Sequence, residues 1–145
     1  MTSRKSIIKL MTAKSDFLES EGDYVPTLKD TKFYYSILNR FLFENKLTQP
    51  KFKIFRLRGS WGYFLGMKEE EDIDEFEIVM TNRFPSIRTF IIALAHEMVH
   101  QHQWEILGKI DVKKGKSPNI NHGPTFFCWR EKFSTLNIPL NRSFR

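Results

Sequence analysis

Hydrophobic and polar residues alternate along this chain with two different periods, which predict helices on both sides of a group of strands. Between residues 27 and 45, apolar side chains recur at steps of three and four, the pattern of one helix face. Shorter runs at residues 52–57, 61–65 and 76–81 are rich in aromatic and β-branched residues, which is typical of strands. Helices followed by strands and then helices predict an α+β fold.

The second half of the chain is predicted to be mostly helical. Residues 86–107 are predicted to form a long helix with Gly108 as its stop. The first half of this segment is apolar on nearly every face, which indicates that the helix is buried. Residues 108–121 have the composition of a flexible loop, and residues 124–136 again have helical spacing. We therefore expect a small three-stranded antiparallel or mixed sheet packed on the buried helix, with N-terminal and C-terminal helices flanking it.

Length and composition predict one folded domain. The 145 residues are 41% hydrophobic and 28% charged, which excludes a disordered, fibrous or membrane-embedded chain. Residues 1–26 are expected to be an arm or short helix, and residues 27–145 a single domain. Cys128 stands alone, which excludes an internal disulfide and a cysteine-built zinc ribbon. We expect its thiol to be buried as a small hydrophobic group.

Charge is distributed unevenly. The net charge is +6, but seven acidic residues gather between positions 68 and 77, so the rest of the chain is more basic than the total suggests. This distribution predicts either weak, sequence-independent DNA binding or simply good solubility. The acidic run predicts a solvated hairpin loop before the third strand. Because Lys9 interrupts the first apolar run, we expect no secretory signal and a cytoplasmic location.

The residues with the clearest chemistry lie inside the predicted buried helix, where His96-Glu97-Met98-Val99-His100 forms an HExxH motif. Residues four apart share one helix face, so two imidazoles can reach one metal ion. The glutamate beside them can accept a proton from water at that ion. Burying two imidazoles and a carboxylate without partners would be costly, which favours a metal site over a chance match.

A catalytic zinc ion usually has three protein ligands and one open position. His122 follows the predicted loop and is the expected third ligand, with Asp111 or Glu131 as weaker carboxylate alternatives. His102 is expected to point to another face of the helix, because it lies about 200° from His100 around the helix axis. The metzincin pattern is excluded, since its glycine and final histidine are absent.

The segment His122-Gly123-Pro124-Thr125-Phe126, taken together with HExxH, resembles the SprT-like (Spartan-type) zinc metalloprotease domain. The resemblance spans about residues 30–140. It implies a zincin-like fold with His96, His100 and His122 as zinc ligands and Glu97 as general base. It also implies action on DNA-associated or crosslinked proteins, although this chain has neither the cysteines of a zinc ribbon nor long partner-binding tails.

These patterns predict a zinc-dependent endopeptidase. Glu97 would take a proton from water and pass it to the leaving amine. The strand at residues 77–81 is either an edge that holds extended substrate or an ordinary member of the sheet. Tyr63 and His102 are candidates for stabilising the oxyanion. The alternative is a non-catalytic DNA-binding or partner-binding module whose zinc ion is structural, with a fourth protein ligand in place of water.

Overall fold

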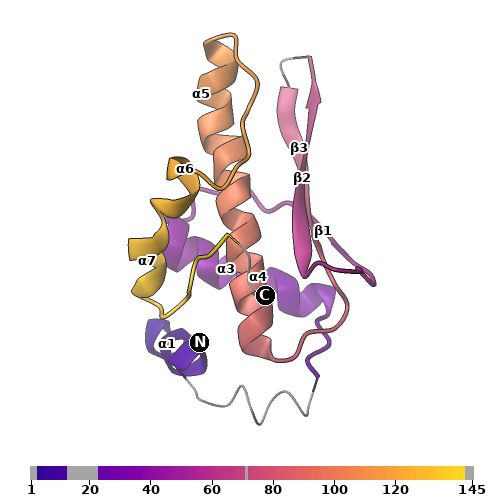
Figure 1. Ribbon diagram of the computed structural model, residues 1–145, viewed down its shortest axis with the longest axis vertical. Helices are drawn as coiled ribbons and strands as arrows, with labels where there is room; N and C mark the ends of the chain where they lie inside the picture. The colour runs from indigo at the N-terminus through magenta and orange to yellow at the C-terminus, as the bar shows by residue number, and fades with distance from the viewer. Residues whose placement is uncertain (1–2, 13–22, 71, 143–145) are drawn as a thin grey trace.

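The computed structural model describes residues 3–12, 23–70 and 72–142, and within them a long central helix separates a small sheet from a group of short helices (Figure 1). The elements in chain order are α1 (Arg4–Thr12), α3 (Leu28–Phe43), β1 (Lys51–Ile54), β2 (Gly62–Glu69), β3 (Asp72–Met80), α4 (Ile87–Gln101), the π-helix η1 (His102–Leu107), α5 (Gly108–Lys113), α6 (Pro124–Phe127) and α7 (Arg130–Ser134). The predicted α+β class is confirmed.

The three-stranded sheet has the order β1-β3-β2 and is mixed. β1 runs parallel to β3, whereas β2 pairs with β3 in the antiparallel sense. β3 is therefore the central strand. Of the two alternatives for residues 77–81, the edge strand is wrong and the ordinary member of the sheet is correct. The acidic run is not a long loop, because β2 continues to Glu69 and β3 begins at Asp72. Most charged side chains in these strands are exposed, and the buried carboxylate of Glu77 is paired with Lys53 Nζ at 3.1 Å.

The buried helix continues beyond its predicted end. Ser86 caps α4 by accepting a hydrogen bond from the Thr89 backbone N–H at 3.1 Å. α4 then passes into η1 and α5 without a break, as Figure 1 shows. Gly108 has helical dihedrals, φ −62° and ψ −37°, and does not end the helix. A Cβ at this position would lie 2.9 Å from Pro118, so the missing side chain lets Pro118 pack closely. The turn that follows α5 has its left-handed glycine at Gly115, with φ +75°.

The hydrophobic core lies where α4 meets α3, the sheet and the C-terminal helices. Leu38 of α3, Ile78 of β3 and Leu94 of α4 are each 0% exposed. The N-terminal helix α1 belongs to the same core, since Ile7 and Met11 are buried there. The expected arm or short helix is thus a packed helix over residues 4–12, while residues 13–22 lie outside the described part.

The predicted C-terminal helix is divided into two short helices, α6 and α7. Phe126 and Phe133 enter the core, both with 0% exposure. The chain turns between them, and this turn places Cys128 on the surface. The prediction of a buried thiol is therefore wrong. Across the described residues, we find no helix with the length and apolar character needed to span a bilayer.

Candidate metal centre

Three imidazoles converge on one point at the middle of the molecule. His96 and His100 lie on one face of α4, one turn apart, and their side chains are each 6% exposed. The Nε2 atom of His122 lies 3.2 Å from Nε2 of His100 and 3.3 Å from Nε2 of His96. Among the described residues, these three histidines form a group that could hold a metal ion.

The loop that returns from α5 positions His122. Asn121 makes a tight local turn, with its Oδ1 accepting a hydrogen bond from the Gly123 backbone N–H at 2.7 Å. A Cβ at residue 123 would lie only 2.7 Å from that oxygen, so glycine lets the Asn121 side chain make this contact without shifting. α6 begins immediately afterwards with Pro124 at its first turn. His122 is thereby fixed between a turn and a helix start.

Gln103 joins this loop to the helix that carries the other two histidines. The side chain is 1% exposed, and its Oε1 accepts a hydrogen bond from Nδ1–H of His100 at 2.9 Å. The same oxygen accepts from the Asn121 backbone N–H at 3.2 Å. Its Nε2 donates to the Asn121 carbonyl at 2.9 Å and to Thr125 Oγ1 at 3.0 Å. Because Nδ1 of His100 carries the proton, Nε2 presents a lone pair to the cluster.

The ring of Phe126 lies against all three imidazoles. Its centroid is 4.8 Å from that of His96, 5.0 Å from that of His100 and 4.7 Å from that of His122. Burial lowers the pKa of His96 to about 3, with the neighbouring imidazoles adding to the effect. Burial likewise lowers the pKa of His100. The buried rings therefore stay neutral at pH 7, which is the form that binds metals.

Glu97 lines the same hollow as the three histidines. The carboxyl group is buried, with the residue 4% exposed, and burial raises its pKa to about 8. A hydrogen bond from the Phe64 backbone N–H acts in the opposite direction by stabilising the carboxylate. The bond also ties the motif to β2, which forms the opposite wall. A carboxyl group with a pKa near neutrality can both accept and release a proton at pH 7.

The hollow over the cluster has a volume of about 350 Å³, and β2 forms part of its wall. Tyr63 lines this hollow and is 40% exposed, so it remains a candidate for contact with a bound molecule. Arg142 lines the hollow as well. Partial burial lowers the pKa of His122, and the positive charge of Arg142 lowers it further. Nothing in the local sequence indicated Arg142, because only folding of the C-terminal segment brings it there.

Three other residues considered from the sequence do not join the cluster. Asp111 and Glu131 are absent from the group of metal-capable side chains found in the described residues. His102 faces away, as expected from its helical angle, and packs on Phe43 and Trp129 with ring centroids 6.2 and 4.9 Å away. The structure therefore gives His102 no contact through which to stabilise an oxyanion in this hollow. Gln103 is a residue that sequence reasoning missed, although its three-residue step from His100 places both on one helix face.

Comparisons with known proteins add no relative. A scan against protein-family models found no match, and neither did searches of curated proteins and of solved structures. The resemblance to SprT-like domains therefore stays a prediction, and functional argument rests on the site itself.

Proposed function

We propose that the protein is a zinc-dependent endopeptidase of the SprT-like kind. The observation that carries the proposal is the convergence of His96, His100 and His122 beside the buried carboxyl group of Glu97. Zinc peptidases use this set of groups: three protein ligands, a proton acceptor and an open position for water.

The separations between the imidazole nitrogens suit zinc. Zn–N bonds of about 2.0–2.1 Å in a tetrahedral arrangement place two ligand nitrogens roughly 3.3–3.4 Å apart. The Nε2 atoms of His122 and the two helix histidines are 3.2 and 3.3 Å apart. Within the described residues, no cysteine, carboxylate or fourth histidine joins this group. That composition favours a catalytic site over a structural one, because structural zinc sites have four protein ligands.

Each group then has a defined part in peptide hydrolysis. Zinc, when bound, would polarise the scissile carbonyl and make water in the hollow more acidic. Glu97 takes a proton from that water and delivers it to the nitrogen of the leaving amine. Its contact with the Phe64 N–H keeps the carboxyl group aimed across the hollow. His100 is held in its metal-binding tautomer by Gln103.

Strand β2 is the edge strand that borders the hollow. Its residues Gly62, Tyr63 and Phe64 all line the site, while its other edge pairs with β3. An extended peptide can add to an exposed sheet edge through main-chain hydrogen bonds. β2 therefore takes the substrate-aligning role that the sequence had suggested for residues 77–81.

The test combines metal analysis with proteolysis of a denatured protein such as casein. We expect one zinc ion per chain and cleavage that a chelator abolishes. Glu97→Gln should retain zinc and lower the rate at least about 10²-fold, because the proton acceptor is gone while all three imidazoles remain. His122→Ala should instead lose zinc. Equal digestion by Glu97→Gln and the wild type would refute the assignment of Glu97.

The basic segments favour a second property, weak DNA binding, which is compatible with proteolysis. Lys113, Lys114 and Lys116 are exposed at and after the end of α5. We expect a sequence-independent affinity that falls steeply between about 50 and 200 mM salt, because phosphate contacts release counterions. Electrophoretic mobility shifts over a salt series measure this, and no binding at the lowest salt would remove the proposal.

A further inference from the structure

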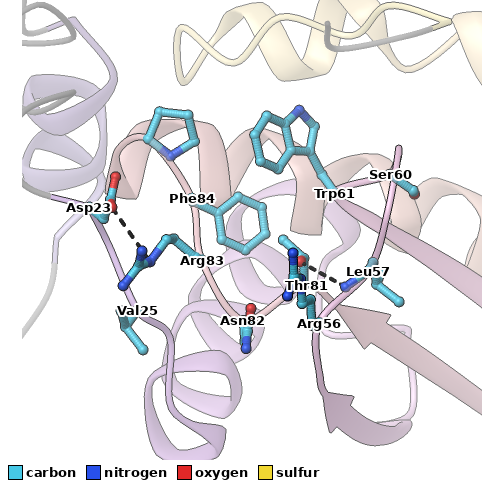
Figure 2. Close-up of a pocket in the computed structure, with 11 residues that line it drawn as sticks. Asp23, Val25, Arg56, Leu57, Ser60, Trp61, Thr81, Asn82, Arg83 and Phe84 are labelled. Carbon is cyan, nitrogen blue, oxygen red and sulfur yellow. Dashed lines mark hydrogen bonds and ion pairs between the residues drawn. The ribbon is translucent and has the colours of Figure 1, made fainter.

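A second hollow, of about 730 Å³, adjoins the candidate metal centre. Ser60 and Trp61 line both hollows, so the two share a wall. Figure 2 shows how the second hollow is built: Arg56 and Leu57 come from the segment after β1, and Arg83 and Phe84 come from the loop after β3. It lies outside the group of metal ligands, and the proposed reaction does not use it.

The hollow has an excess of positive charge. Within the described residues, Arg56 has neither a hydrogen bond nor an ion pair. Arg83 pairs with Asp23 across 3.4 Å, but their side chains are 69% and 45% exposed, so the pair is weak and can exchange partners (Figure 2). Two guanidinium groups against one carboxylate leave the hollow suited to an anion.

The walls between these charges combine aromatic rings with polar side chains such as Ser60 and Asn82, and two contacts hold them in place. Phe84 is 0% exposed and stacks on Trp61, with the ring centroids 5.3 Å apart and the planes at 27°. Thr81 Oγ1 accepts a hydrogen bond from the Leu57 backbone N–H at 3.2 Å, which joins the two segments that carry the arginines (Figure 2). An occupant with a short hydrocarbon stem and an anionic end matches this lining better than a bare inorganic anion.

We propose that this hollow is a specificity subsite that binds the carboxylate side chain of a Glu or Asp residue in the peptide substrate. The proposal rests on the peptidase function and names a substrate class for it. A peptide that runs along β2 into the metal centre passes the wall made by Ser60 and Trp61. A side chain turned across that wall reaches Arg56 and Arg83. A nucleic-acid strand fits less well, because its phosphates need a continuous track of cations and Asp23 interrupts this one.

The experiment measures kcat/KM of the zinc-loaded full chain on a peptide series in which one Glu is moved along an otherwise neutral sequence, each member matched by a Gln peptide. We expect one position at which the Glu peptide is preferred by about fivefold, the upper range for a solvent-accessible ion pair. Arg56→Ala and Arg83→Ala should each bring this ratio towards one. Arg58→Ala is the control, since it removes the same charge from the same segment without lining the hollow.

Three outcomes would overturn the subsite. The first is that no position shows a Glu preference, and the second is that Arg58→Ala lowers the ratio as much as Arg56→Ala. The third is that a short single-stranded oligonucleotide occupies the hollow in place of the Glu peptide. A binding arm separates this failure from failure of the proposed function. Fluorescence anisotropy of the same labelled peptides on Glu97→Gln reports the Glu-over-Gln ratio without cleavage. Tighter Glu binding that depends on Arg56 supports the subsite even if the wild type cleaves nothing, and equal binding refutes it.

Discussion

At the scale of single residues, the side chain of Gln103 makes four hydrogen bonds beside the metal centre. Its amide group uses all of its contacts to join His100, on the central helix, to Asn121 and Thr125, on the loop and helix around His122. The three imidazoles come from two distant parts of the chain, and this amide holds the parts in register. We therefore infer that the affinity for metal depends on Gln103 although it is not a ligand.

The substitution Gln103→Leu should lower zinc affinity about 10–100-fold, the usual cost of losing a partner behind a metal ligand. Gln103→Glu keeps an acceptor for His100 Nδ1–H, so its zinc affinity should fall less than that of Gln103→Leu. Thr125→Val removes only the contact farthest from His100 and serves as the control. Chelator competition measures all three affinities. Equal zinc affinity in Gln103→Leu and the wild type would show that the histidines are held by other contacts.

At the scale of elements, β2 and η1 pack against each other where Gly66 lies beside Trp104. The indole ring of Trp104 lies so close to Gly66 that a Cβ at residue 66 would be 2.4 Å from ring atoms. The same ring is fixed by a hydrogen bond from its Nε1 to the Ile73 carbonyl at 2.8 Å. Because η1 continues directly from α4, this contact helps to set the distance between the edge strand and the helix that carries the HExxH motif.

We expect Gly66→Ala to destabilise the fold by about 1–3 kcal/mol, because the added methyl group overlaps a ring that has little freedom to move. Leu65→Ala is the matched control on the same strand: Leu65 is 44% exposed, so its truncation should change stability by less than about 0.5 kcal/mol. Urea unfolding of the two variants measures the difference. Similar midpoints would mean that Trp104 can shift without cost.

At the scale of the whole molecule, buried titratable groups make the stability of the metal-free protein depend on pH in two directions. Histidines whose pKa is lowered by burial stay neutral in the fold, whereas the unfolded chain takes up protons below about pH 6.5. Stability is therefore lost as pH falls below 6.5, by about 1.4 kcal/mol per pH unit for each such proton. Glu97, with its pKa raised to about 8, keeps its proton in the fold and lowers stability as pH rises from 4.5 to 8.

Thermal unfolding of the metal-free protein should therefore show its highest Tm near pH 6.5. In Glu97→Gln the decrease in Tm above pH 6.5 should disappear, because the neutral amide does not titrate. The loss below pH 6.5 should become steeper, because the opposing contribution of Glu97 is gone. A wild-type Tm that is constant from pH 6.5 to 8 would show that Glu97 ionises in the fold without cost.

The local features of the fold and of the site could be predicted from the amino-acid sequence alone. Helical periodicity over residues 27–45 and 86–107 and the four-residue step between His96 and His100 are set by the geometry of one helix, so they need no distant contact. The α+β class followed from the order of the two periodicities. The convergence of His122 with the helix histidines was also anticipated, since a histidine beside a returning loop and a helix start can reach a neighbouring helix face.

Which strand lies at an edge, and which distant residues meet, depends on long-range packing of the folded chain. β3 is central because β1 pairs with it in parallel on the side opposite β2. The alternation of side chains within one strand does not encode which strands will be its neighbours. Gly108 continues the helix with helical dihedrals, although a glycine there reads as a stop. That Arg56 and Arg83 line one hollow, and that Arg142 lines the hollow over the histidines, depends on how loops fold over the sheet and helix. Such long-range contacts have no local period, and for that reason the sequence did not reveal them.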